Sequence, residues 1–353
     1  MGFLNRVSTA FAFPCSDNNH KVSIVGTHLE DNFIDIFKSN KFVHPVLKSK
    51  IPKNVKLYKF QSFSILLKNA DLIVLGISSQ GFKWACDQLT KIKKNQQILI
   101  LTKGLGINKN KYEVYPEVIK NFLLKKKIKN IKISVAAGPC LAAELSKRVF
   151  TNVVFANRDI SVVKNLSKMI STSYYKIKCS SDLIGVAACG GVKNIYSMIV
   201  GTSMGMNLKN IKDNKNLNTA AALFNQSIKE MRYFIKKIGG QESTVMDLAG
   251  IGDLYVSCTG GRNSKMGKFI GMGLTYKNAK KNKMPNETVE GADLIFDIGN
   301  KGAKFTRGRR WILIYKKKLQ SKKSAMQFEY NLKKNRKIRK QLIEKFISTT
   351  IDC

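Results

Sequence analysis

The chain has 353 residues, which is enough for two domains, because a single core rarely grows beyond about 250–300 residues. Apolar residues make up 44% of it, which excludes a wholly disordered chain. The net charge of +39 would suit a nucleic-acid-binding protein, but the lysines are spread along the whole chain among asparagine and isoleucine. We therefore interpret most of this charge as solvated surface and do not expect nucleic acid as a partner.

The cysteines and the apolar runs of the sequence indicate its cellular compartment. The seven cysteines are odd in number and form no CxxC pair, so neither a zinc site nor a disulfide framework is indicated. Reduced thiols fit a cytoplasmic protein. No apolar run approaches the roughly 20 residues that a membrane span needs. We expect a cytoplasmic protein with no metal and no membrane span.

The first half of the sequence predicts an α/β domain. Helical patterns at Phe82–Ile92 and Val114–Leu124 alternate with continuously apolar strands, which is typical of a parallel sheet covered on both faces. Ligands bind beyond the carboxyl ends of such strands, so polar residues at these ends indicate a cofactor cleft. The predicted strands are Lys21–Thr27, Asn69–Ser78, Gln97–Gly104 and Ile131–Ala137.

The second half predicts a helical domain that contains a polar site. Lys193, Asp253 and Arg262 each stand among small and apolar residues, where a charge is costly to bury unless it meets a partner or a ligand. The pattern between Gly185 and Asn263 therefore indicates a site. Helical patterns cover Ile195–Met204, Asn218–Ile238, Thr244–Leu248 and Ser264–Met272.

Residues 300–353 differ in character from the rest, because lysine dominates them and only Glu329, Glu344 and Asp352 are acidic. A flexible basic tail and an arm that binds RNA or a membrane surface are both open. We divide the chain into residues 1–180, an α/β domain; residues 181–299, a helical domain; and residues 300–353, a divergent basic segment.

Several fragments, taken in order over residues 9–299, resemble NAD(P)-dependent glycerol-3-phosphate dehydrogenase. The resemblance implies an N-terminal Rossmann-type dinucleotide-binding domain and a helical substrate domain. It also implies NAD or NADP as cofactor, a homodimer, and interconversion of dihydroxyacetone phosphate and sn-glycerol 3-phosphate for glycerophospholipid synthesis. The fragments are Ala70-Asp71, Thr102-Lys103-Gly104, residues 137–144 and 181–186, Lys193-Asn194, residues 230–232 and 248–254, Gly261-Arg262-Asn263 and residues 289–291.

The resemblance also implies roles for particular residues. Lys193 takes the role of the acid–base group, since reducing a ketone needs a proton donor and the reverse reaction needs a base. Gly190 and Gly191 would let the substrate approach closely. The implied substrate-binding residues are Lys103, Gly138, Cys140, Lys193, Asp253, Gly261, Arg262 and Asn263. The implied cofactor-binding residues are Arg6, Val7, Thr27, Lys103, Ala142, Arg262, Thr288 and Glu290.

The sequence departs from the family pattern at its beginning. It lacks the GxGxxG motif, whose glycines let backbone amides approach a pyrophosphate. The register of the resemblance places this loop near Phe3–Ser8, with Arg6 and Val7 at the positions that would touch the pyrophosphate. We expect the first strand and the glycine-rich loop to be missing or altered, and cofactor affinity to be weak. Cys140 also stands where the family usually has serine or threonine.

Three alternatives remain open at this stage. The chain is an active dehydrogenase, an inactive or impaired relic of one, or a basic nucleic-acid-binding protein. The last would bind in a salt-dependent way, although the sequence has no helix-turn-helix, finger or RNP-like signature. The choice between NAD and NADP is also open, because neither Thr27 nor His28 is a clear acidic or arginine ligand.

Overall fold

The computed structural model describes residues 6–93, 95–108, 111–206, 216–285, 287–292 and 294, and part of the segment 328–344. It falls into two compact units, Met1–Asp297 and Ile298–Cys353. The α/β half and the helical half both belong to the first unit, and their predicted division at residue 181 stays a prediction. In the second unit, the described residues lie between Phe328 and Glu344 and are mostly helical.

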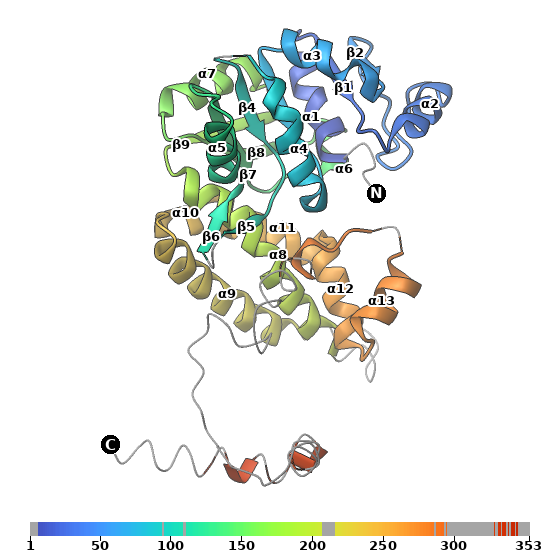
Figure 1. Ribbon diagram of the computed structural model, residues 1–353. Coiled ribbons are helices and arrows are strands. Elements are labelled where there is room, and N and C mark those ends of the chain that lie inside the picture. Colours follow the sequence, from blue (N-terminus) through green and yellow to red (C-terminus); the bar gives the residue numbers. More distant parts are fainter. Residues whose placement is uncertain are drawn as a thin grey trace. The chain divides into compact units, whose positions relative to one another are not determined.

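The α/β half contains a five-stranded sheet and a separate two-stranded one (Figure 1). The larger sheet has the order β3-β4-β7-β8-β9, and the smaller one pairs β1 with β2 in parallel. The strands are β1 (Val22–Val25), β2 (Val55–Tyr58), β3 (Leu72–Leu75), β4 (Gln97–Ile100), β7 (Lys132–Ala137), β8 (Thr151–Ala156) and β9 (Tyr175–Ser180), with a small hairpin of β5 (Leu105–Asn108) and β6 (Lys111–Val114).

The expected parallel sheet is confirmed for the predicted strands, and one antiparallel pairing follows beyond them. Strands β3, β4 and β7 are parallel, but β8 runs antiparallel to β7, and β9 then runs parallel to β8. The four strands expected from continuous apolar runs are confirmed as β1, β3, β4 and β7. In β4, for example, Ile98, Leu99 and Ile100 are fully buried, as expected for a strand covered on both faces.

Helices and short turns connect these strands. Helices α4 and α5 confirm the two helical patterns expected in this half. The connecting elements are α1 (Arg6–Asp17), α2 (Asp31–Ser39), η1 (Phe60–Ser62), α3 (Phe63–Asn69), η2 (Ser79–Gly81), α4 (Phe82–Gln88), η3 (Leu89–Lys91), α5 (Tyr115–Lys125), α6 (Ala142–Leu145) and α7 (Ile160–Ile170).

The structure corrects the expected place of two cofactor residues. Arg6 and Val7 lie in the first turn of helix α1, rather than in a loop. Among the described residues, no strand joins β1 to β3. In a doubly wound sheet the first strand lies between the second and the fourth. The break in strand order therefore falls where the sequence predicts a missing first strand.

The helical half is built around one long buried helix, α8 (Leu183–Met206). It contains the predicted helix 195–204 and begins earlier, so that Gly190, Gly191 and Lys193 are helical as well. In Figure 1, the remaining helices gather around α8 at one end of the sheet. They are α9 (Leu217–Lys237), α10 (Glu242–Val245), the π-helical turn η4 (Leu248–Gly252), α11 (Asp253–Gly260), α12 (Arg262–Gly271) and α13 (Tyr276–Lys283).

Helix α8 has the length and composition of a membrane span, and it is the one such helix among the described residues. However, 78% of its most apolar window is buried inside the protein. Its packing against neighbouring helices accounts for its apolar character, since a helix that is apolar all round is typical of a buried core.

Glycines allow α8 and α12 to pack with their backbones close together. A Cβ atom on Gly201 would lie 2.2 Å from the carbonyl oxygen of Ser264, and one on Gly267 would lie 2.1 Å from that of Met198. Gly205 and Gly271 are similarly enclosed by the facing helix. Small residues four positions apart on each helix are what such close packing requires. This contact fixes Lys193 on α8 relative to the start of α12.

We predict that Gly267→Ala destabilises the protein, although alanine is the better helix former. The added methyl group must push the two backbones apart, which costs about 1–3 kcal/mol or more of the free energy of unfolding, measured by urea denaturation. Gly260→Ala is the control, because its Cβ would meet nothing closer than 3.8 Å. Equal stability of the two variants would contradict this packing.

Candidate active site

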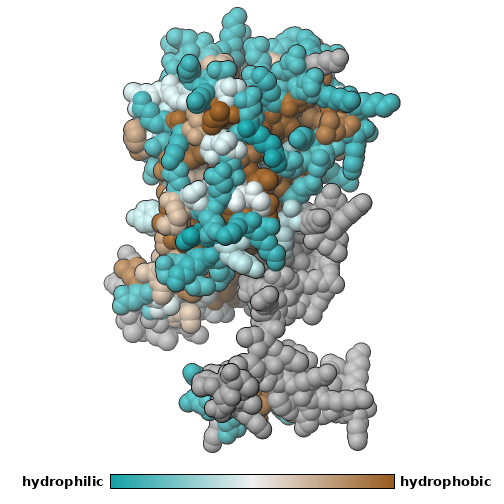
Figure 2. Space-filling model, turned by 90° about the vertical axis from the view of Figure 1, so that its left-hand side faces the viewer, coloured by the Kyte–Doolittle hydropathy of each residue, from teal (hydrophilic) through white to brown (hydrophobic). Residues whose placement is uncertain are grey.

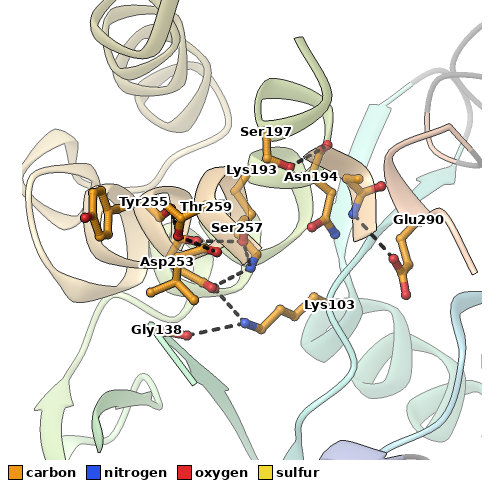
Figure 3. Close-up of polar contacts among 12 residues, drawn as sticks. Lys103, Gly138, Lys193, Asn194, Ser197, Asp253, Tyr255, Ser257, Thr259 and Glu290 are labelled. Carbon is orange, nitrogen blue, oxygen red and sulfur yellow. Dashed lines mark hydrogen bonds and ion pairs between the residues drawn. The ribbon is translucent and has the colours of Figure 1, made fainter. Parts of the chain in front are cut away.

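A buried lysine and a buried aspartate form the centre of the site (Figure 3). Lys193 on α8 is 6% exposed, and Asp253, the first residue of α11, is 2% exposed. The Nζ atom of Lys193 donates to Oδ1 of Asp253 and, at 2.6 Å, to Oγ of Ser257. Ser257 in turn donates to the backbone oxygen of Asp253 at 2.7 Å. The lysine is thus held by two groups one helical turn apart on α11.

A second lysine reaches the same carboxylate from the sheet. Lys103 follows β4, and its Nζ atom lies 2.6 Å from Oδ2 of Asp253 and 3.4 Å from the carbonyl oxygen of Gly138 (Figure 3). Its side chain is 25% exposed. Asp253 therefore bridges two ammonium groups, one from each half of the unit. A charge buried in this way is tolerated because it is paired.

The pairing shapes the proton affinities of all three groups. Burial lowers the pKa of Lys193 to about 8, although Asp253 raises it, and the positive charge of Lys103 lowers it further. Burial also lowers the pKa of Lys103, but Asp253 outweighs this and holds it above the usual value. Burial raises the pKa of Asp253, yet the two lysines keep it below the usual value. The site thus holds one lysine that can titrate near neutral pH.

Two predicted residues line the loop after β7. Gly138 has φ +121°, a backbone conformation that residues with a side chain rarely adopt. Its carbonyl oxygen faces Lys103. Cys140 lies within electrostatic range of both lysines and of Asp253, and burial raises the pKa of its thiol to about 11. A neutral thiol is a weak hydrogen-bond donor.

The two glycines before Lys193 face the loop that carries Lys103. A Cβ atom on Gly190 would lie 3.4 Å from the side chain of Lys103, and one on Gly191 would lie 3.2 Å from the backbone of Gly104. They therefore make room for the loop that carries Lys103. The approach that they permit is that of this loop to helix α8.

A second polar cluster forms where α12 begins. Nη2 of Arg262 lies 2.5 Å from Oε1 of Glu290, which also accepts from Thr288 at 2.9 Å. Nδ2 of Asn263 lies 3.5 Å from the other oxygen of Glu290, and its Oδ1 accepts from the Gly291 amide at 2.8 Å. The predicted substrate and cofactor residues of this region are thus brought together.

A small cavity connects the two clusters, since it takes lining residues from both. Lys103 belongs to the first cluster and Glu290 to the second. The cavity is also lined by residues of α8 and by Tyr115. The Tyr115 ring stacks on that of Phe82, with the two ring centroids 3.7 Å apart. Its lining includes Ser79, Lys103, Tyr115, Gly191, Asn194 and Glu290.

The other predicted cofactor residues lie apart from the lysine pair. Arg6 is close enough to Arg262 and Glu287 to interact with both: burial lowers its pKa, Arg262 lowers it further, and Glu287 raises it. Val7 and Ala142 both pack against the core cluster beneath the sheet. Thr27 lies at the carboxyl end of β1, and its hydrogen bonds are with Glu30 and with the Leu29 amide.

Sequence reasoning missed three residues of this site. Ser257 was recognisable, because it stands four residues after Asp253 on one helix, a spacing that places side chains on the same face. Asn194 follows Lys193 directly and lines the cavity. Tyr115 carried no signal, since its position in the cavity depends on the packing of α5 against Phe82.

In the described part of the chain, no group of three or more histidine, cysteine, aspartate or glutamate side chains could hold a metal ion. The six described cysteines form no disulfide. What remains is a dinucleotide-type sheet whose carboxyl edge meets a buried lysine–aspartate site in a helical half. This combination defines a dehydrogenase with an α/β half and a helical half.

The comparisons with known proteins are more specific. Two protein-family models match the chain. The model described as NAD-dependent glycerol-3-phosphate dehydrogenase N-terminus matches residues 8–163. The model described as NAD-dependent glycerol-3-phosphate dehydrogenase C-terminus matches residues 182–304. The chain belongs to the NAD-dependent glycerol-3-phosphate dehydrogenase family. The Rossmann-type fold with a helical second half is therefore confirmed.

Known glycerol-3-phosphate dehydrogenases are similar to this chain over most of its length. It is 28% identical over 273 residues, 77% of this chain and 79% of the other, to an NADP(+)-dependent glycerol-3-phosphate dehydrogenase of Archaeoglobus fulgidus. It is 29% identical over 297 residues, 83% of this chain and 84% of the other, to a glycerol-3-phosphate dehydrogenase (NAD(P)+) of Clostridium botulinum. The crystal structure of glycerol-3-phosphate dehydrogenase from Coxiella burnetii has a TM-score of 0.71 and 25% identity, over 83% of this chain and 85% of that one.

We predict that Asp253→Asn destabilises the folded protein strongly. The substitution leaves two buried ammonium groups without a counter-charge, and breaking a buried ion pair costs about 3–5 kcal/mol. The free energy of unfolding from urea denaturation measures the loss. Asp35→Asn is the control, since its partner Lys59 lies at the surface and the pair should contribute little. A comparable, small change in both variants would contradict the structural role of Asp253.

Proposed function

We propose that the chain is an NAD(P)-dependent glycerol-3-phosphate dehydrogenase in which Lys193 is the acid–base group. It interconverts dihydroxyacetone phosphate and sn-glycerol 3-phosphate by hydride transfer. The observation that carries the proposal is the buried Lys193, with a pKa of about 8, held between Asp253 and Ser257. It shares Asp253 with Lys103, which lines a cavity at the sheet edge. A group with this pKa can take up and release a proton near neutral pH.

Oxidation of glycerol 3-phosphate removes a proton from the C2 hydroxyl group and a hydride from the C2 carbon. The nicotinamide cofactor, when bound, accepts that hydride. Neutral Lys193 takes the hydroxyl proton, and its ammonium form returns a proton to the oxygen in the reverse direction. Asp253 fixes the direction of Lys193 and favours its ammonium form. Lys103, which keeps its charge, stabilises the negative charge that develops on the oxygen.

The second cluster supplies groups for the substrate's phosphate. Arg262 and Asn263 are the first two residues of α12, where the helix dipole and free backbone amides favour an anion. A guanidinium group suits a phosphate dianion, which it can contact through two N–H groups. In the described structure, the carboxylate of Glu290 accepts hydrogen bonds from Arg262 and from Asn263. A phosphate group would compete with Glu290 for these donors.

The described residues also fit a dinucleotide at the sheet edge. Lys103, Thr288 and Glu290 lie around the cavity or beside it. Arg6 stands in the first turn of α1, a twelve-residue helix whose N-terminus favours an anion, and it lies near Arg262. Its guanidinium group offers hydrogen-bond donors to a pyrophosphate, as the backbone amides of a glycine-rich loop do in other dinucleotide-binding folds. Residues 1–180 would thus make most of the contacts with the cofactor, and residues 181–299 most of those with the substrate.

Assembly and location follow from the same proposal. The enzyme works as a homodimer in the cytoplasm, and its glycerol 3-phosphate enters glycerophospholipid synthesis. Family membership supports this. Light scattering on the purified protein tests the dimer.

We predict that Lys193→Ala abolishes turnover and leaves the fold intact. Loss of a positioned acid–base group typically costs about 10²–10⁴-fold in rate. Steady-state kinetics with either cofactor measure the rate, and circular dichroism checks the fold. Lys178→Ala is the matched control, because that lysine forms a surface ion pair with Asp247. Turnover retained by Lys193→Ala would remove this lysine from the mechanism.

The lowered pKa of Lys193 predicts opposite pH profiles for the two directions. Oxidation needs neutral Lys193, so kcat/KM for glycerol 3-phosphate should rise with pH up to an apparent pKa of about 8 and then level off. Reduction needs the ammonium form, so kcat/KM for dihydroxyacetone phosphate should fall above that pKa. Profiles that run in parallel in both directions would contradict Lys193 as the titrating group.

A further inference from the structure

The loop that follows β1 bears on the choice of cofactor. Strand β1 ends at Val25, and the Gly26 amide still donates to Tyr58 of β2 at 3.1 Å. The loop Gly26–Glu30 therefore begins at the carboxyl end of the parallel β1–β2 pair. In doubly wound folds, an acidic residue in this region accepts a hydrogen bond from the ribose 2′-hydroxyl of NAD, whereas an arginine accommodates the 2′-phosphate of NADP.

Glu30 is a buried carboxylate in this loop with one acceptor to spare. It is 4% exposed, and its Oε2 atom accepts from the Thr27 amide at 2.8 Å. The Glu30 amide donates to the carbonyl oxygen of Thr27 at 3.0 Å. The two bonds together hold the carboxyl group against this turn. Its Oε1 atom is buried and has no hydrogen-bond partner in the described structure. Buried polar atoms are nearly always paired, so this oxygen points to a missing donor.

Aromatic rings stand beside the same loop. The His28 ring lies 5.2 Å from that of Trp84 and 6.0 Å from that of Phe60, and the latter two are 5.4 Å apart. They come from the loop after β1, from α4 and from the turn after β2, and all three are at least partly exposed. Partly exposed rings at a ligand edge offer a face on which a base can stack.

The local charges disfavour an additional phosphate group. Asp31 adds a second carboxylate directly after Glu30 and accepts from the Phe60 amide at 3.1 Å. Lys59, which follows β2, is paired with Asp35 at 2.7 Å. A 2′-phosphate dianion placed here would face two carboxylates, and like charges at close range repel.

We propose that Glu30 accepts a hydrogen bond from the 2′-hydroxyl of the cofactor's adenosine ribose and thereby makes the enzyme prefer NAD to NADP. The inference rests on the proposed function. The relatives reported above are named for NADP and for NAD(P)+, so the preference must come from this chain's own residues. Glu30 is three residues beyond Thr27, which the resemblance implies to be a cofactor-binding residue.

Equilibrium titration of the full chain with NADH and with NADPH tests this without requiring turnover. The wild-type protein should bind NADH at least about 10-fold more tightly, as expected for one hydrogen bond to a charged group. Glu30→Gln keeps the shape and an acceptor but removes the charge. It should weaken NADH binding about 10-fold and leave NADPH binding equal or improved, so that the preference disappears.

Two matched variants separate charge, stacking and hydrogen bonding. Asp31→Asn removes one negative charge next to Glu30 and can still accept from the Phe60 amide, so the preference should fall by less than it does in Glu30→Gln. His28→Ala removes one ring of the platform and should weaken both cofactors equally. A preference that collapses in Asp31→Asn as much as in Glu30→Gln would assign it to general charge and overturn the specific contact.

The outcomes distinguish this inference from the proposed function. Tighter binding of NADPH by the wild-type protein, or an unchanged preference in Glu30→Gln, overturns the inference alone. Preferential NADH binding that Glu30→Gln abolishes, without turnover of glycerol 3-phosphate, supports the inference and contradicts the proposed reaction. Binding of neither cofactor overturns both. Should Glu30→Gln not fold, titration of the wild-type protein with ADP-ribose and with 2′-phospho-ADP-ribose decides, with the former expected to bind more tightly.

Discussion

The carboxylate of Asp253 is the group on which the site depends. It is almost fully buried, and it bonds Lys193 on one oxygen and Lys103 on the other. One lysine belongs to the helical half and the other to the sheet, 150 residues away from Asp253 in the sequence. The same three charges therefore join the halves, keep one lysine ionised, and leave the other with a pKa at which it can exchange a proton.

Close helix packing holds these charges in place. The glycines that bring α8 against α12 position Lys193 relative to Arg262 and Asn263, while Gly190 and Gly191 admit the loop of Lys103. A larger side chain at these positions would separate the acid–base group from the groups suited to a phosphate. Catalysis by a dehydrogenase requires this spacing, because the hydroxyl group and the phosphate group belong to one small substrate.

Much of this arrangement could be predicted from the sequence, because it depends on local pattern. Continuous apolar runs identified the central strands, and ionisable residues among glycine and alanine identified Lys193 and Asp253. The direction of β8 could not be read, because pairing direction is set by the fold and not by the strand. Ser257 lay within reach of helical spacing, whereas the bond between Lys103 and Asp253 and the burial of Glu30 exist only in the folded chain.

The central claim is that a complete acid–base site operates in a chain whose sequence contains no GxGxxG motif. The most direct measurement is reduction of dihydroxyacetone phosphate by the purified full chain, followed as oxidation of NADH and, separately, of NADPH. The account predicts cofactor-dependent formation of glycerol 3-phosphate, with a raised KM for the cofactor but a measurable kcat. No product with either cofactor at saturating substrate, from a protein shown to be folded, would contradict it and favour an inactive relic of the family.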